Sequence, residues 1–589
     1  MQKTNVSFAA FIAIALTALI TDYLVFFFKI PYGFSLATAF LTIAIVAFIK
    51  RKFLKEHISF NFQKADILFF LVFLIIFCFE IGAPLTAYDE ANYHIYLQEN
   101  AFTDKINFDY FAGKNLNAFL FPLGDRMFYI IRFLIGYRLG VLLSYFTIIC
   151  VYYQVKKLLS CLNTKNKNKK LIPFFSAAIV FTQVILILMT HSYYIDSFSI
   201  PLILEIVIQC IALKNGQKIS KKKTLYISLL AGIAGAIKVT NLLLALAIII
   251  ATKFIKKIKV NFATIAISFA AIIVPIAPYA IDNFIQTGSP LYPYYNKIFQ
   301  SPYFADENFQ DERFNIPKIL SFFVWPIYTS VFNPKYGDNS GIIDATWAIG
   351  YIAILVILRI NIGRKDKNKN AHFLIYISLI CTIVWVFGLA GYMRYAMVIP
   401  IMYLAVLACT LMEIKKLPQK ITCITLALIA IITPLPTVER YLYGRSAENF
   451  FKDKNFKIHI DGVWGVIDDD SFLTSMVREE GTPIYNLDVY QNSTSELTKN
   501  LTREKIEGKE FYMLTDNMLR WYYSKKVKYL EMNGWQIEEL IHSYDSKEMP
   551  YLTKYDYAYL IKVKYVGTFP DEPTYEAKNF FPLNNPDYY

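Results

Sequence analysis

Two adjacent carboxylates, Asp89 and Glu90, follow the third long apolar run of the chain, and Tyr93 and His94 come shortly after them. A carboxylate at a membrane surface can accept the proton of a substrate hydroxyl or hold a cation. Capping of a helix by Asp89, with solvated neighbours, explains the same residues, and both interpretations stay open. The segment is therefore a candidate site for general-base chemistry.

Four cations and a further carboxylate lie beyond this pair. Lys114 and Arg126 follow in the same loop and could pair with a lipid phosphate, although anchoring at the membrane interface explains them equally well. Asp196 begins an apolar run after a short turn, a place where a lone Asp is commonly structural. Lys238 lies between two apolar runs and needs a phosphate or carboxylate partner unless it snorkels to the surface. Arg394 stands between two further runs, in a position suited to clamping phosphate.

The elements around these residues are long apolar runs. Of the 589 residues, 56% are hydrophobic and only 18% are charged, fewer than in an average soluble domain. The runs are long enough to cross a hydrocarbon core, so the predicted fold class is a polytopic α-helical membrane protein with about thirteen transmembrane helices. We expect these helices near residues 6–28, 32–49, 65–82, 132–155, 171–190, 197–213, 224–237, 239–252, 260–281, 341–360, 371–391, 395–414 and 419–436.

The positive charge predicts the orientation in the cell membrane. The net charge is +14, and basic clusters such as residues 50–52 and 221–223 stand in short loops between apolar runs. Because such loops stay in the cytoplasm, the N-terminus is expected inside. The expected outer loops are then residues 83–131, 191–196, 282–340 and 392–394. No nucleic-acid-binding motif accompanies the basic residues, so no nucleic-acid partner is expected. The seven cysteines lack metal-ligand spacing, and neither zinc nor a disulfide framework is indicated.

The interpretation of residues 224–252 decides the orientation of all the spans that follow them in the sequence. Residues 224–252 could form one long helix or a hairpin of two short ones. A single helix would place the lysines from Lys253 onward outside the membrane, against the charge rule. We therefore prefer the hairpin, which places Lys238 at its outer end after a stretch of small residues.

The composition changes near residue 437. The expected transmembrane domain, residues 1–436, includes a catalytic outer loop at 83–131, and residues 437–589 are expected to form a small extracytoplasmic α/β domain. Apolar segments of strand length occur at 510–514, 527–530 and 557–566, and helical segments are expected at 519–525 and 535–542.

Together, these pieces resemble the GT-C superfamily of membrane glycosyltransferases, and especially bacterial enzymes of the aminoarabinose-transferase and protein-mannosyltransferase type. In family order, the matching pieces are Tyr88-Asp89-Glu90 with Tyr93-His94, Phe121-Pro122-Leu123, Tyr194-Ile195-Asp196, Gly232 to Lys238, Thr287-Gly288-Ser289-Pro290-Leu291-Tyr292-Pro293 and Arg394-Tyr395. The family's frequent double proline is Phe121-Pro122 here, and no clear Asp-x-Asp follows in the second outer loop. These departures leave the metal and the phosphate ligand open.

The resemblance implies an inverting transferase that moves a sugar from a polyprenyl-phosphate-linked donor to a glycan, lipid or protein acceptor on the extracytoplasmic face. Asp89 or Glu90 would be the general base, a cation would hold the donor phosphate, and Asp196 would support the acceptor or a cation. The implied cofactor is at most a divalent cation. The implied catalytic residues are Asp89 and Glu90, and the implied substrate-binding residues are Tyr93, His94, Lys114, Asp196, Lys238 and Arg394.

Two other functions stay open at this point. A polysaccharide polymerase or ligase would join glycans already assembled on lipid, and would typically rely on arginines in large outer loops. A lipid-linked glycan transporter, or a non-catalytic membrane scaffold, is the third possibility. A transporter should place charges near the membrane midplane, whereas the candidates here gather at one face.

Overall fold

The computed structural model divides into two compact units. The helical unit comprises residues 1–83, 121–279 and 310–446, and the second unit comprises residues 84–120, 280–309 and 447–589. The second unit thus combines most of the expected C-terminal domain with parts of two expected outer loops. The structure describes residues 3–59, 62–80, 89–99, 119–164, 168–217, 220–256, 261–304, 306–309, 323–332, 344–361, 368–389, 391–414, 417–432, 456–466, 474, 477–479, 482, 484–487, 506, 508–516, 534–545, 548–549 and 557–566.

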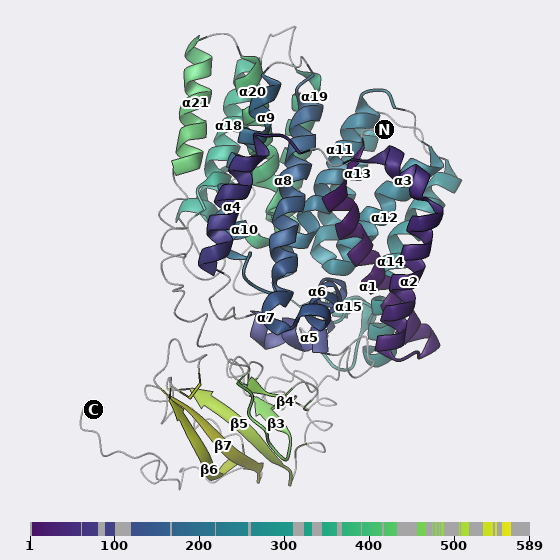
Figure 1. Cartoon of the computed structure of the whole chain (residues 1–589), viewed down its shortest axis with the longest axis vertical. Coiled ribbons are helices and arrows are strands. Elements are labelled where there is room, and N and C mark those ends of the chain that lie inside the picture. Colours follow the sequence, from purple (N-terminus) through teal and green to yellow (C-terminus); the bar gives the residue numbers. More distant parts are fainter. Residues whose placement is uncertain are drawn as a thin grey trace, which may run out of the picture. The chain divides into compact units, whose positions relative to one another are not determined.

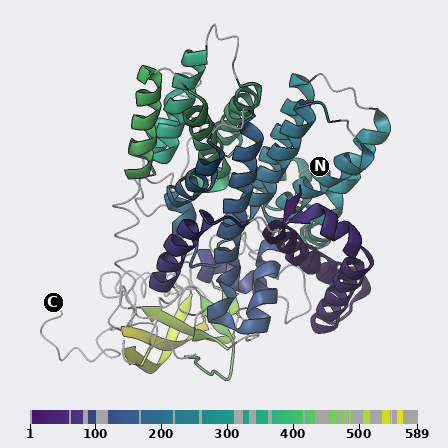
Figure 2. The same ribbon diagram turned by 45° about the horizontal axis from the view of Figure 1, so that its top comes forward.

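The helices of the helical unit lie side by side (Figure 1), and α18, α20 and α21 pack together (Figure 2). Within the described part of the chain, five segments are long and apolar enough to cross a membrane, which indicates a membrane protein: α1, α2, Asp196–Lys214, α14 and α19. The count of about thirteen spans stays a prediction. The main helices are α1 (Val6–Phe28), α2 (Tyr32–Ile49), α4 (Asp66–Glu80), α8 (Leu142–Leu162), α11 (Ser199–Lys214), α12 (Lys221–Ile237), α13 (Val239–Ile255), α14 (Phe262–Thr287), α18 (Thr346–Asn361), α19 (Lys369–Gly388), α20 (Val398–Glu413) and α21 (Leu417–Ile432).

Two expected helices are each divided in the structure. The segment expected at 132–155 is wrong in its bounds, because α6 (Leu123–Ile135) ends at Gly136 and α7 (Tyr137–Gly140) and α8 follow. Gly136 has φ +87°, a conformation that glycine adopts without steric cost. The segment expected at 171–190 is two helices, α9 (Ile172–Phe181) and α10 (Val184–Leu188). The first segment contains only Arg132 and Arg138 as charged residues and the second contains none, so both are mainly apolar and hydropathy alone did not predict the breaks.

The helices differ in how much of their side-chain surface is buried. In α11 and α20 nearly every side chain is buried, as expected for helices that are apolar all round and lie in a core. In α2 and α14 large side chains such as Phe34, Phe262 and Phe269 are exposed. An apolar exposed surface of this kind suits contact with lipid. The central helices therefore supply the rigid frame on which polar residues can be placed.

The expected hairpin is confirmed at the level of the helices. The structure has two helices, α12 and α13, that pack against each other and are separated at Lys238. Lys238 has an extended backbone, with φ −160° and ψ 124°. The small residues before it allow close packing, since a Cβ at Gly232 would lie 2.5 Å from the carbonyl oxygen of Ile272 in α14.

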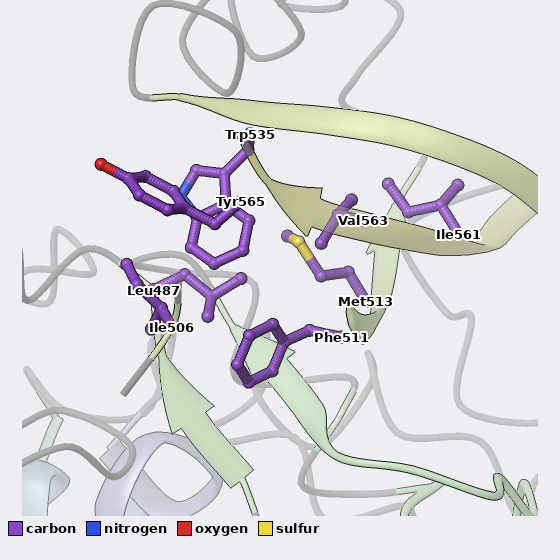
Figure 3. Close-up of a cluster of buried hydrophobic side chains, with 8 residues drawn as sticks. All are labelled: Leu487, Ile506, Phe511, Met513, Trp535, Ile561, Val563 and Tyr565. Atoms are coloured by element: carbon purple, nitrogen blue, oxygen red, sulfur yellow. The ribbon is translucent and has the colours of Figure 1, made fainter. Parts of the chain in front are cut away.

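In the second unit, the described C-terminal residues form a five-stranded sheet of order β4-β3-β5-β7-β6. Strand β3 is parallel to β4 and β5, and β7 is antiparallel to β5 and β6. The strands are β3 (Trp464–Val466), β4 (Ile484–Asn486), β5 (Glu510–Asp516), β6 (Trp535–Asp545) and β7 (Tyr557–Tyr565). Figure 3 shows the core against this sheet, where Phe511, Trp535 and Tyr565 gather with smaller apolar side chains.

The helix expected at 535–542 is wrong, because these residues belong to β6. Two register shifts lie in the pairing of β6 with β7, between Ile537 and Glu539 and between Leu540 and His542. Each shift interrupts the alternation of a strand, so the apolar residues fall at a spacing that imitates a helix. The strands expected near 510–514 and 557–566 are present as β5 and β7. The expected segments 519–525 and 527–530 lie outside the described residues.

Candidate functional site

Three of the residues singled out in the sequence come together in the helical unit. Lys238 Nζ lies 2.5 Å from Asp196 Oδ1. Arg394 Nε lies 3.6 Å from Asp196 Oδ2. We refer to Asp196, Lys238 and Arg394 as the Asp196 cluster.

Each member of the cluster stands at an end or a break of a helix. Asp196 opens a short 3-10 helix, η5 (Asp196–Phe198), at the head of the buried helix α11. Lys238 is the break between α12 and α13. Arg394 lies in η8 (Met393–Ala396), just before the buried helix α20. Helix ends are where polar side chains can leave an apolar bundle, and the buried helices hold these ends in place.

Aromatic rings surround the two cations. Lys238 Nζ lies 4.1 Å from the centre of the Tyr395 ring. The guanidinium carbon of Arg394 lies 4.8 Å from the centre of the Tyr194 ring and 5.4 Å from that of Tyr392. Cations at these distances from ring faces are attracted to them. The same rings offer flat apolar faces beside the charges.

Burial makes the charge balance of the cluster important. The side chains of Asp196, Arg394 and Lys238 are 1%, 6% and 14% exposed. Buried charges are stable only with partners. Among the described residues, two cations converge on this one carboxylate, and a pair of cations suits an anionic ligand. Among the described residues no group of three or more His, Cys, Asp or Glu side chains has the arrangement of a metal site.

The turn before Arg394 is fixed by close contacts with tryptophans. Trp385 Nε1 donates a hydrogen bond to the carbonyl oxygen of Tyr392 at 2.9 Å. Gly391 has φ +71°, and a Cβ at this position would overlap the indole of Trp325. Glycine is therefore required here both by backbone conformation and by space.

We expect Gly391→Ala to lower the free energy of unfolding by about 1–3 kcal/mol, because it adds overlap with Trp325 to backbone strain. Thermal unfolding of the purified protein in detergent measures the effect. Gly288→Ala is the matched control, since Gly288 also has a positive φ (+77°) but has open space around it. Equal losses in the two variants would show that the indole contact does not matter.

A second buried carboxylate, from α4, contacts the turn that leads to Asp196. Glu80, at the end of α4, accepts hydrogen bonds from Tyr145 Oη at 3.0 Å and from Thr190 Oγ1 at 2.6 Å. Tyr145 Oη also lies 3.3 Å from His191 Nδ1. The sequence analysis did not single out Glu80. Its signal was a lone carboxylate at the end of an apolar run, where the cost of burial requires partners.

The structure does not place Arg126 at the membrane interface, where one interpretation of the sequence had it as an anchor. Its side chain is fully buried, and its Nε lies 3.6 Å from Asp22 Oδ1 within the helical unit. Asp22 Oδ2 also accepts a hydrogen bond from Tyr279 Oη at 2.8 Å. The Arg126 side chain therefore faces a carboxylate from α1 rather than the open membrane interface. Asp22 was missed because nothing in the first apolar run identifies its partner.

The carboxylate pair of the first outer loop belongs to the second unit. Asp89 is half-buried and precedes the short π-helix η1 (Glu90–His94), but its side chain makes no capping hydrogen bond to that helix. The capping interpretation is therefore wrong for Asp89. Glu90 and His94 are buried, and the rings of Tyr93 and His94 lie 4.3 Å apart. Lys114 lies outside the described residues.

A hydrogen bond joins the two ends of the Gly- and Pro-containing loop after α14, and another joins the end of α14 to Phe119. Ser301 Oγ donates to the carbonyl oxygen of Thr287 at 2.6 Å, and Asn283 Nδ2 donates to that of Phe119 at 3.0 Å. The Tyr292 ring is buried edge-on against Phe119, with ring centres 5.0 Å apart. Tyr292 therefore contributes to packing in the second unit.

Comparison with known proteins places this chain in a family. Residues 1–401 match the family model described as "Domain of unknown function (DUF8201)". The chain belongs to this family. A search of curated proteins found no match to this DUF8201 sequence.

Solved structures that are similar to the DUF8201 chain at low identity include the following three. ArnT from Cupriavidus metallidurans bound to undecaprenyl phosphate is 11% identical over 84% of this chain and 97% of that chain, with a TM-score of 0.41. The arabinofuranosyltransferase AftD from Mycobacteria is 10% identical over 87% and 40%, with a TM-score of 0.47. The oligosaccharyltransferase AglB from Archaeoglobus fulgidus, in complex with an inhibitory peptide and a dolichol-phosphate, is 12% identical over 86% and 74%, with a TM-score of 0.41. At such scores these likenesses carry no argument about activity, so the proposal below rests on the residues of this chain.

Proposed function

We propose that the protein is a membrane glycosyltransferase that moves a sugar from a polyprenyl-phosphate-linked donor to an acceptor on the extracytoplasmic face. The observation that carries the proposal is the Asp196 cluster, in which Lys238 and Arg394 converge on one buried carboxylate. A phosphate is the natural ligand of two adjacent cations at a membrane surface. The N-terminus and the basic loops would then lie in the cytoplasm.

The chemistry needs two kinds of group. The acceptor hydroxyl oxygen attacks the anomeric carbon of the donor, its proton passes to a carboxylate, and the bond from the anomeric carbon to the phosphate oxygen breaks. Polyprenyl phosphate leaves, and the configuration of the sugar inverts. Lys238 and Arg394 would stabilise the charge that develops on the leaving phosphate. Asp89, or its neighbour Glu90, would be the base.

Asp196 has a distinct part in this proposal. Before the donor binds, Asp196 holds the two cations close together. When the donor binds, phosphate oxygens replace Asp196 as the partner of one of these cations. The faces of Tyr194, Tyr392 and Tyr395 lie beside the cations and suit the apolar face of a sugar ring or the start of a polyprenyl chain. A divalent cation stays a prediction.

Lys238→Gln and Arg394→Gln test the role of the cluster. We expect each to lower kcat/KM for the donor at least about tenfold, since each removes a hydrogen bond to a charged ligand. The purified protein is incubated with undecaprenyl-phosphate-linked sugars and a membrane extract as acceptor, and release of undecaprenyl phosphate is measured. Lys222→Gln, a change of an exposed lysine on α12, is the control.

Unfolding is measured on the same samples, so that a loss of activity can be told apart from a loss of folded protein. Full activity of both cluster variants would overturn the assignment of Lys238 and Arg394 to the donor phosphate. Activity with oligosaccharide-bearing donors alone would instead favour a polymerase or ligase. Movement of labelled lipid across vesicles without covalent transfer would favour a transporter.

A further inference from the structure

A polar cavity of about 480 Å³ lies in the helical unit, away from the Asp196 cluster. The two places are related through α8. Ser144, near the start of α8, donates a hydrogen bond to the carbonyl oxygen of Ser192 at 2.8 Å, in the turn that leads to Asp196. Ser160, near the other end of α8, lines the cavity. At a rise of about 1.5 Å per residue, these two serines are about 24 Å apart, so the cavity is a separate site.

Several short elements close the cavity around the end of α8. Strand β1 (Thr4–Asn5) pairs in parallel with β2 (Ile58–Ser59), which brings Asn5 and Ser59 to one wall. Gln63 lies before α4, and its backbone N–H donates to Asp66 Oδ2 at 2.8 Å. Lys169, in the 3-10 helix η4 (Lys169–Leu171) that follows α8 in the sequence, also lines the cavity. The wall is thus built from three segments that are far apart in the chain.

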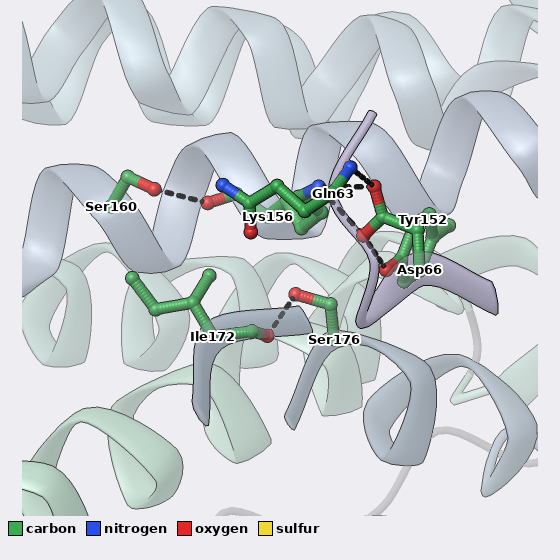
Figure 4. Close-up of polar contacts among 7 residues, drawn as sticks. All are labelled: Gln63, Asp66, Tyr152, Lys156, Ser160, Ile172 and Ser176. Atoms are coloured by element: carbon green, nitrogen blue, oxygen red, sulfur yellow. Dashed lines mark hydrogen bonds and ion pairs between the residues drawn. The ribbon is translucent and has the colours of Figure 1, made fainter. Parts of the chain in front are cut away.

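A polar network holds Lys156, one of the residues that line the cavity (Figure 4). Lys156 Nζ lies 2.7 Å and 2.8 Å from the two oxygens of Asp66, and Tyr152 Oη donates to Asp66 Oδ1 at 2.6 Å. Asp66 is fully buried and Lys156 nearly so. Because both charges are held by several hydrogen bonds, the position of Lys156 is set before any ligand arrives.

The lining is strongly positive. Four lysines line the cavity, namely Lys3, Lys156, Lys157 and Lys169, and no described carboxylate does. Asp66 pairs with Lys156, and Glu205 pairs with Lys157 at 2.9 Å, each from behind the lining. Lys3 and Lys169 are exposed, and their charges remain available to a ligand. The hydroxyl of Ser59 and the amide of Asn163 add neutral donors, whereas the hydroxyl of Ser160 already donates to the carbonyl oxygen of Lys156 at 2.8 Å.

We propose that this cavity binds a phosphate-bearing anion. Ammonium, hydroxyl and amide donors around a space of this size match the oxygens of a phosphate group and leave room for what the phosphate is attached to. The phosphate could belong to a lipid headgroup or to a soluble compound. Exposed apolar side chains flank the cavity at Ile67 on α4 and at Leu171 and Phe174 near the start of α9, where lipid chains could lie.

The test uses full-length protein in uncharged detergent and two probes, inorganic phosphate and dioctanoyl phosphatidic acid. We expect at least one probe to bind, and the Lys3→Gln/Lys169→Gln double variant to bind it at least about fivefold more weakly. Both lysines are exposed, so the variant is expected to fold, which thermal unfolding without probe checks. Lys420→Gln, which removes an exposed lysine of α21, is the matched control and should bind as the parent does.

Each result decides the proposal. Binding of phosphatidic acid alone identifies a lipid headgroup as the ligand, and binding of inorganic phosphate identifies a soluble one; both support the site. The proposal is overturned if neither probe binds, or if the double variant and Lys420→Gln bind alike. It is also overturned if binding is lost in Lys238→Gln but kept in the double variant, because the probe would then occupy the Asp196 cluster.

Discussion

Replacement of Asp89 by Asn is expected to lower the rate of sugar transfer about 100- to 10,000-fold, because an amide cannot accept the proton of the acceptor hydroxyl. The change keeps the size and shape of the side chain, and thermal unfolding of the variant checks that the protein stays folded. Asp89 is half-buried, and its side chain does not cap the helix that follows it. The measurement is the initial rate of undecaprenyl phosphate release at saturating donor, so that the effect is read in kcat rather than in donor affinity.

The neighbouring carboxylate makes a series of variants necessary. Glu90→Gln and the Asp89→Asn/Glu90→Gln double variant separate the two candidates, since the residue whose single change abolishes turnover is the base. Asp306→Asn, which changes an exposed aspartate of the second unit, is the control and should keep full activity. A double variant that transfers sugar at the parent rate would rule out both carboxylates, and with them the general-base part of the proposed function.

The second large effect is on stability. Arg126→Met should lower the free energy of unfolding by about 3–5 kcal/mol, because it leaves Asp22 as a buried charge without its cation. Only the hydrogen bond from Tyr279 would remain to Asp22 among its described contacts. Unfolding of the purified protein in detergent, by heat or by denaturant, measures the loss.

A double variant tests the cause of this loss. Asp22→Asn removes the stranded charge, so Asp22→Asn/Arg126→Met should recover much of the stability lost in Arg126→Met. Arg359→Met, which changes an exposed arginine of α18, should have an effect within about 0.5 kcal/mol. If Arg126→Met proves as stable as Arg359→Met but loses donor binding, Arg126 is a phosphate ligand, as one interpretation of the sequence allowed.

The sequence by itself determined where most helices lie and which residues deserved attention. Runs such as Val6–Phe28 and Tyr32–Ile49 are apolar along their whole length, and a helix is the structure that satisfies their backbone in lipid. The break at Lys238 was also predicted, because the charge rule favoured a hairpin over a single helix through it. Asp196, Lys238 and Arg394 were noticed because an ionisable residue beside apolar runs is costly without a reason.

Only the tertiary structure decided which charges meet. The pairing of Lys238 and Arg394 with Asp196, and of Arg126 with Asp22, joins segments far apart in the chain, and single-sequence patterns contain no information about such contacts. The same limit explains β6, whose register shifts against β7 hid its strand character. Apolar residues that recur at every second position, or at every third to fourth, show which face of a segment is buried. Which partner fills those surroundings is set by packing of the whole chain, because a buried charge or a strand edge is stable only against one particular neighbour.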